Sequence, residues 1–188
     1  MSFAGKYVRA VDALNYRIGR VMMYGIFVMV GILLWSSVSK TFFNPSLWTL
    51  EIAQFALVTY YIMGGPYSLQ LGSNVRMDLF YGEWSAHRKA QIDAITVLFL
   101  LFYLGILLHG GLNSLAYSLG HFKGDTYGFF IGLLSGTEEI GRLERSPTAW
   151  RPFLWPIKIL MCVGFFLMLL QAISELIKDI AKIRGVEL

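Results

Sequence analysis

The sequence predicts an all-α integral membrane protein, and three observations carry that prediction. The chain of 188 residues is 56% hydrophobic and only 15% charged, whereas soluble domains are about 45–50% apolar and about 25% charged. Its uncharged stretches are long enough for helices to cross a bilayer. Its charged residues gather at the edges of those stretches, where they fix orientation. A disulfide scaffold is excluded because the chain has 1 Cys, and disorder is excluded by 14 Phe, 10 Tyr and 5 Trp.

Four membrane spans are predicted from the gaps between charged residues. Uncharged residues run over 21–39, 52–75 and 94–122, and over 152–174 with Lys158 as the one exception. Each gap approaches or exceeds the roughly 20 residues that a helix needs to cross about 30 Å of hydrocarbon. We predict a single four-helix membrane domain over residues 1–188, with spans at about 20–39, 48–71, 91–117 and 152–175. No small-residue cleavage site follows the first span, so we expect it to be retained.

The basic residues predict the orientation. Ten of the 16 Lys and Arg residues lie on the side that holds the two termini and the linker after the second span. The side richer in basic residues faces the cytoplasm in membrane proteins. Both termini are therefore expected to be cytoplasmic, and the long loop over about 118–150 is expected to be periplasmic. Because the basic residues flank apolar spans, we expect contact with membrane lipid and no nucleic acid partner.

Segments outside the spans are expected to lie at the membrane surface. Residues 3–20 place apolar side chains at spacings of three or four, which favours an amphipathic interfacial helix; alternatively, this segment extends the first span into the cytoplasm. In the outer loop, residues 127–134 are apolar but too short to span a bilayer, so they predict a surface-lying, re-entrant or docking segment. The charged residues 138–145 are expected to form a helix in water.

The sequence shows no motif or spacing of reactive residues that is typical of an enzyme or a redox protein. Of the 3 His residues, only His109 lies well inside a span, so no second span offers a matching axial ligand for a haem. We expect His109 to be a hydrogen-bonded residue at a helix interface. No phosphate-binding or dinucleotide fingerprint can be read, and His, Cys and acidic residues lack metal-site spacing. The chain is expected not to be an enzyme and to need no cofactor or metal.

The start of the second span is the most informative local feature. Trp48 lies where an aromatic belt is expected, and Glu51 lies one helical turn further in. The carboxylate is either an exposed acid favoured by the helix dipole or a buried contact to another helix or subunit. The spans otherwise show no ion-sized polar cluster and no internal repeat, which is unlike a carrier that binds its own substrate.

Four motifs in their order along the chain resemble a known family. They are the WTLE stretch ending at Glu51, the pair Gly64-Gly65, the stretch GSNVRMD over residues 72–78, and WRPFLWP over residues 150–156. The arrangement resembles the small membrane subunit of tripartite ATP-independent periplasmic (TRAP) transporters, the DctQ family. The resemblance covers nearly the whole chain. The outer loop is longer than in many members, so its role is not carried over.

The resemblance implies a three-part transporter in the bacterial cell inner membrane. A periplasmic substrate-binding protein captures an organic acid, and a large many-helix membrane subunit moves it inward with sodium. The small subunit packs on the static scaffold of the large one and binds neither substrate nor sodium. Trp48, Glu51, Arg76 and Asp78 are then candidates for structural or subunit contacts. The alternative function is a membrane anchor of an electron-transfer complex.

Overall fold

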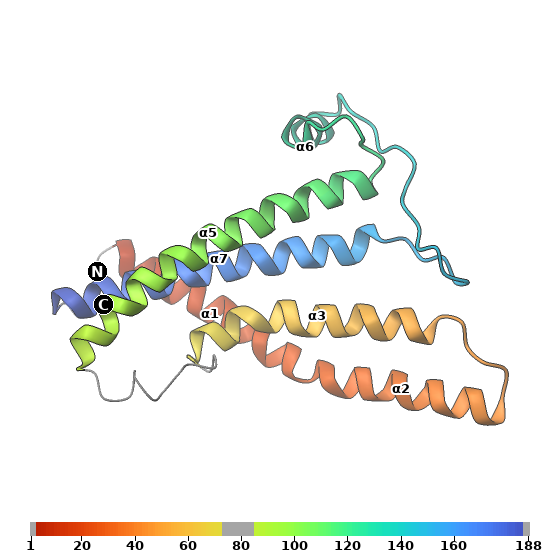
Figure 1. Cartoon of the computed structure of the whole chain (residues 1–188), viewed down its shortest axis with the longest axis horizontal. Helices are drawn as coiled ribbons and strands as arrows, with labels where there is room; N and C mark the ends of the chain where they lie inside the picture. The colour runs from red at the N-terminus through yellow and green to blue at the C-terminus, as the bar shows by residue number, and fades with distance from the viewer. Residues whose placement is uncertain (1–2, 73–84, 186–188) are drawn as a thin grey trace.

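The computed structural model describes residues 3–72 and 85–185, and these residues form an elongated bundle of helices (Figure 1). The described part of the chain is helical apart from its connections, which include one isolated bridge between Arg145 and Phe153. In chain order the helices are α1 (Phe3–Met23), α2 (Gly25–Phe42), α3 (Thr49–Gln70), α5 (Ala86–Ser118), α6 (Thr126–Ser135) and α7 (Trp155–Arg184).

Helices α1 and α2 follow one another with only Tyr24 between them. The first span expected at 20–39 therefore begins inside α1, and α2 continues beyond its predicted end to Phe42. Helix α1 packs against α3 and α7. Its buried side includes Val8, Val11 and Asn15, whereas the sequence places Phe3 and Val11 on one lipid-facing stripe. Phe3 is exposed and Val11 is buried within the protein, so protein packing rather than lipid covers part of that stripe.

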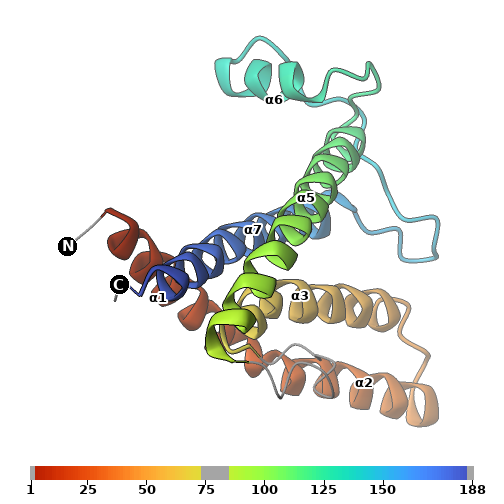
Figure 2. The same ribbon diagram turned by 60° about the vertical axis from the view of Figure 1, so that its left-hand side comes forward.

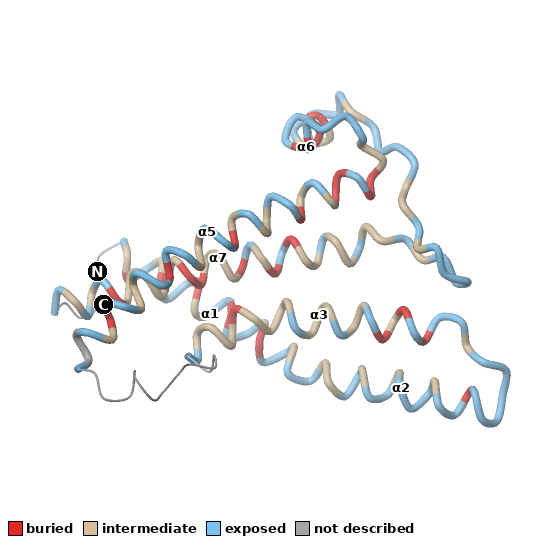
Figure 3. The backbone as a smooth tube through the Cα atoms, viewed as in Figure 1, coloured by how far each residue is buried: buried red, intermediate tan, exposed pale blue. Residues whose placement is uncertain are grey.

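Helix α7 is the central helix of the bundle, because it packs against α5 on one side and α3 on the other. Figure 2 shows the same helices from a second direction, in which α5 crosses α7. The close crossing of α3 and α7 requires a glycine, since a Cβ at Gly164 would overlap the Ile62 side chain. Small residues of this kind let membrane helices approach closely. Buried positions follow the lines where helices meet, and the outward faces are exposed (Figure 3).

The start of α1 and the end of α7 lie at one end of the bundle, which we call the inner end (Figure 1). The turn between α2 and α3 and the connection from α5 to α7 lie at the other, the outer end. Among the described residues, three helical stretches are long and apolar enough to cross a membrane: Phe3–Phe42, Arg88–Ser118 and Trp155–Arg184. The 22-residue helix α3 is not one of them, so the four-span count and the orientation of the termini stay predictions.

The outer loop corrects one expectation. Residues 138–145 were expected to be helical, but the structure gives them bends and extended backbone. The backbone amides of Gly141 and Glu144 instead donate to the carbonyls of Leu119 and Ser118, at the end of α5. These contacts satisfy carbonyls that a helix end leaves free. They also bring Gly120, at φ +89°, so close to the Arg142 backbone that no side chain fits there. Capping of α5 therefore prevails over helix formation in this stretch.

Candidate functional site

Glu51, the acid that the sequence places at the start of α3, is buried. Trp48 precedes α3 directly and is 38% exposed, while Glu51 in its first turn is 4% exposed. The Ser146 hydroxyl, from the outer loop, donates to Glu51 Oε1 at 3.4 Å. Glu51 Oε2 is buried and has no hydrogen-bond partner among the described residues. The carboxylate thus contacts the outer loop of its own chain and retains capacity for a further donor.

Hydroxyl groups next to Glu51 join α2 to α3. Ser46 lies within hydrogen-bond distance of Ser39 at 3.1 Å and of Thr49 at 2.9 Å. Thr49 also donates to Ser36 Oγ at 3.2 Å. Ser39 and Thr49 are almost fully buried. These contacts fix the outer ends of α2 and α3, and thereby hold Glu51 in place.

A second polar cluster, at the inner end, joins α1 to α7. One carboxylate oxygen of Asp12 accepts from Gln171 Nε2 at 2.9 Å and from Ser174 Oγ at 3.0 Å. Its other oxygen pairs with Lys178 Nζ at 2.7 Å. Asn15 donates to Gln171 Oε1 at 2.7 Å, and the side chains of Asn15, Gln171 and Ser174 are at most 1% exposed. We call these residues, with Glu175, the inner polar cluster.

The inner polar cluster was not predicted from the sequence. Its central acid, Asp12, was not singled out because the charge-gap argument starts after Arg20, and its partners lie more than 150 residues away. One signal was present: Asn15 follows Asp12 by one helical turn, on the α1 side that carries the buried Val8 and Val11. Helix α3 joins the same cluster, because Gln70 Nε2 donates to the Asp12 carbonyl at 3.2 Å. The inner ends of three helices are therefore held together.

His109 is hydrogen-bonded to its neighbours on α5 and α6. Its Nδ1 lies 2.8 Å from the Tyr127 hydroxyl, and its Nε2 lies 3.2 Å from Asn113 Nδ2. The Thr126 hydroxyl donates to Asn113 Oδ1 at 2.6 Å. An Asn113 amide that donates to Nε2, with Nδ1–H donating to Tyr127, satisfies both ring nitrogens. His109 thus joins α5 to α6, and its two nitrogens are already engaged.

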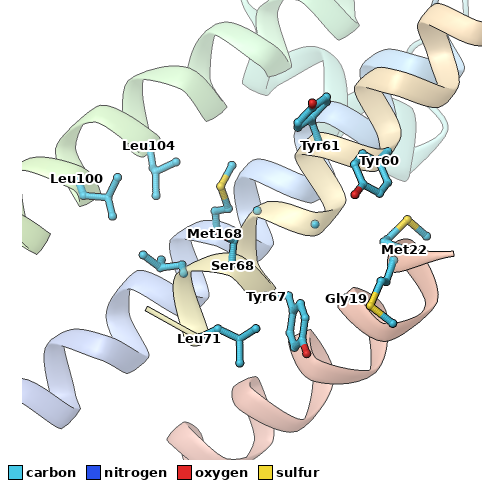
Figure 4. Close-up of a pocket in the computed structure, with 14 residues that line it drawn as sticks. Gly19, Met22, Tyr60, Tyr61, Tyr67, Ser68, Leu71, Leu100, Leu104 and Met168 are labelled. Carbon is cyan, nitrogen blue, oxygen red and sulfur yellow. The ribbon is translucent and has the colours of Figure 1, made fainter. Parts of the chain in front are cut away.

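An apolar groove opens on the side of the bundle between α3 and α5. Figure 4 shows Leu100 and Leu104 of α5 facing Tyr61 and Leu71 of α3, with Met168 of α7 between them. The hollow has a volume of about 640 Å³, and Gly19 and Met22 of α1 also contribute to its lining. Gly64 and Gly65 lie in this groove. The two glycines differ: a Cβ at Gly65 would press on Met168, while one at Gly64 would meet open space.

Two of the predicted contact residues, Arg76 and Asp78, lie outside the described residues. Within residues 3–72 and 85–185, no three His, Cys, Asp or Glu side chains come together in a way that could hold a metal ion. The buried polar side chains of this part of the chain lie either on α1 and α7, or in α6 and the outer turns of α2, α3 and α5. The first group is Asn15, Gln171, Ser174 and Asp179, and the second is Ser39, Thr49, Glu51, Ser118 and Thr126.

A bundle of apolar helices with polar contacts at its two ends is typical of a membrane subunit. A family model, described as the DctQ component of tripartite ATP-independent periplasmic transporters, matches residues 29–182. The chain therefore belongs to the DctQ family. Searches of curated proteins and of solved structures found no match. Members of this family are components of TRAP transporters that work with a large membrane subunit and a binding protein, and this match gives no support to the electron-transfer alternative.

Proposed function

We propose that this chain is the small transmembrane subunit of a TRAP transporter in the bacterial inner membrane. It supports sodium-coupled, binding-protein-dependent uptake of an organic acid. Helices α2, α3, α5 and α7 are its four spans, and both termini are cytoplasmic. The observation that carries this proposal is the family match over residues 29–182.

The role is that of a fixed frame rather than of a carrier. In the described residues, the buried polar side chains of α3 and α5 lie at the outer ends of these helices, at Thr49, Glu51 and Ser118. Thr59, near the middle of α3, donates to the carbonyl of Phe55 in its own helix. A carrier would instead need convergent polar groups near the midplane. The chain therefore leaves substrate and sodium to its partners and contributes apolar surface to the complex.

The groove between α3 and α5 is the face that receives the large subunit. It is apolar, it is open to the side of the bundle, and Gly64 exposes backbone at its surface. Helices in lipid associate through close packing at small residues, because lipid offers them no hydrophobic driving force. A helix of the large subunit packs into this groove. Trp48, Glu51, Arg76 and Asp78 are proposed as further contacts to the large subunit.

The test is a tryptophan at Gly64. Since a Cβ at Gly64 meets open space in the groove, we expect Gly64→Trp to leave the fold of the subunit intact while its ring obstructs a helix of the large subunit. The tagged variant is expected to insert normally, to lose co-purification with the large subunit, and to lose uptake. The matched control is Gly31→Trp on α2, where a side chain also meets open space. Full co-purification of the Gly64→Trp variant would exclude the groove as the interface.

A further inference from the structure

Helix α6 has a position that the proposed transport role does not explain. After α5 the chain turns back, and α6 lies beside α5 and across the long axis of the bundle; it is seen end-on in Figure 1 and from the side in Figure 2. The helix is capped at both ends. The Asp125 side chain accepts from the Gly128 amide at the N-cap, and Gly136 adopts the left-handed conformation at the C-cap. Its 10 residues would reach only about 15 Å, so it cannot cross a bilayer.

Polar and apolar contacts fix α6 on α5. The hydrogen bonds of Tyr127 to His109 and of Thr126 to Asn113 hold its first turn. Phe129 is 2% exposed and packs in a cluster with Leu115 and Ala116 of α5. These contacts place α6 along the last turns of α5, on the bundle side of its end at Ser118.

The depth of α6 follows from a charged pair at the same end. Lys158 Nζ binds Glu144 at 2.6 Å and the Ser114 carbonyl at 3.1 Å, which marks the level of Ser114 as one where charges are tolerated. His109 lies five residues further in on α5, or about 7.5 Å at the rise of an α-helix. Helix α6 contacts α5 from His109 to Ala116, so it lies at this depth. Interfacial helices lie about 5–10 Å deep, at the boundary of headgroups and acyl chains.

The outward face of α6 has the chemistry of a lipid contact. Residues 126–135 carry no charge, and Ile131 and Leu134 are 66% and 91% exposed. On α5, Phe102 and Ile106 are also exposed apolar side chains, at helical spacing from His109, which contacts α6. Exposed apolar side chains are therefore present both on α6 and on the turns of α5 further in.

Further out, a basic hollow follows α6. Arg142, Arg145 and Arg151 line a hollow of about 640 Å³ together with Tyr117 and Phe122. Its acid, Glu144, is already paired with Lys158, and no other carboxylate pairs with the three arginines in the described chain. From α6 outward, apolar side chains are followed by arginines that have no carboxylate partner in the described chain. A membrane leaflet has the matching order, because its acyl chains are followed by phosphate groups.

We propose that α6 is an interfacial helix seated in the leaflet at the outer end, with Ile131 and Leu134 among acyl chains and the basic hollow facing the phosphate of an anionic phospholipid. The occupant of this surface is lipid. The inference needs only that the chain spans a membrane, and it does not depend on transport or on the large subunit.

The first test measures depth with nitroxide labels on the full chain in nanodiscs that contain phosphatidylglycerol. Cys162 is replaced by Ala, and single cysteines are introduced by Ile131→Cys and Leu134→Cys. Phe102→Cys is the lipid reference and Glu139→Cys, which lies beyond α6, is the water reference. We expect labels at 131 and 134 to relax with oxygen rather than with a water-soluble nickel chelate, as at 102. Access to the chelate would overturn the proposal, and so would labels that neither reagent reaches, because protein would then cover α6.

The second test measures retained lipid by native mass spectrometry. A surface cation contributes enough attraction to an anionic lipid that Arg151→Gln should lower retention of phosphatidylglycerol about fivefold, with no change for phosphatidylcholine. Lys40→Gln, which removes a cation from the end of α2, is the matched control and should leave retention unchanged. Equal losses in the two variants, or no loss in Arg151→Gln, would contradict a headgroup site in the hollow.

Discussion

The two ends of the bundle treat Asp12, which is half-buried, and Glu51, which is buried, differently. At the inner end, the carboxylate of Asp12 accepts from Gln171, Ser174 and Lys178 at 2.7–3.0 Å. At the outer end, Glu51 is more deeply buried but accepts one hydrogen bond of 3.4 Å, and its Oε2 has no partner in the described chain. Both carboxylate oxygens of Asp12 are therefore engaged within the chain, while Glu51 retains an unused carboxylate oxygen. At the inner end, the amide oxygens of Asn15 and Gln70 are the buried acceptors without a partner in the described chain.

The difference between Asp12 and Glu51 points to two roles for polar groups in a membrane subunit, stabilising its own fold and contacting other components. Polar contacts between helices stabilise a bundle in lipid, where water cannot replace them. A buried acceptor without a donor costs free energy. A subunit can retain such an acceptor when another component of the complex supplies the donor. We infer that the inner polar cluster maintains the fold and that the outer end contributes to the complex. Four substitutions test this comparison.

The largest effect is expected for Asp12→Leu. It removes the acceptor shared by α7 side chains and leaves Gln171 and Lys178 with Glu175 as their carboxylate partner, so the free energy of unfolding should fall by about 2–4 kcal/mol. Unfolding of the purified chain in mixed micelles measures it. A single variant as stable as the wild type would mean that the cluster does not hold α1.

Glu51→Gln should alter the complex more than the chain. Glutamine keeps an acceptor for Ser146 and removes the charge, so insertion and stability of the isolated subunit should change little. Loss of a contact worth about 1.4 kcal/mol would lower the affinity for the large subunit tenfold, which co-purification and uptake can measure. Glu139→Gln, an exposed acid of the outer loop, is the control. Unchanged uptake and co-purification would show that Glu51 serves its own chain only.

Tyr127→Phe should loosen α6 without unfolding the bundle. The variant loses the hydrogen bond to His109, which contributes about 1 kcal/mol in membrane proteins. Hydrogen exchange of the α6 backbone amides should then become several-fold faster, while α7 is unaffected. Tyr103→Phe, on the exposed side of α5, removes a hydroxyl with no partner among the described residues. Equal exchange rates in the two variants would argue against the His109 contact as the anchor of α6.

The smallest effect is expected for Lys182→Ala. Its ammonium lies 3.2 Å from Asp179, whose side chain is 8% exposed, but the lysine side chain is 66% exposed. A pair with one exposed partner is expected to contribute about 1 kcal/mol or less. The same unfolding assay should therefore hardly distinguish the variant from the wild type. If Lys182→Ala lowered the free energy of unfolding as much as Asp12→Leu, the Asp12 contacts would not be the stronger ones at the inner end.

Sequence patterns predicted the long helices well and their polar contacts poorly. The segment 48–71, expected to be the second span, is helical as α3 over Thr49–Gln70, although α3 is not among the stretches long and apolar enough to cross a membrane. The Asp12 contacts depend on which faces of α1 and α7 meet, and a single sequence does not contain that information. The failed helix at 138–145 has a similar cause: its amides cap α5, a tertiary contact that local helix preference does not reveal.

The site residues show the same limit. Glu51 could be singled out because a carboxylate inside an apolar stretch is costly, but its contact with Ser146 depends on how the outer loop folds back. His109 was expected to be hydrogen-bonded at a helix interface, and the structure shows this contact with α6. Arg76 and Asp78 fall outside the described residues, so their roles stay predictions.

The most direct test of the central claim is purification of the tagged chain from its native membrane in mild detergent, followed by mass spectrometry. A TRAP subunit should bring with it a stoichiometric, many-helix membrane protein, and the complex should take up an organic acid only with sodium and a periplasmic binding protein. A haem-bearing or soluble catalytic partner would contradict the account. Recovery of the chain alone, with transport activity in liposomes, would show that it is itself the carrier.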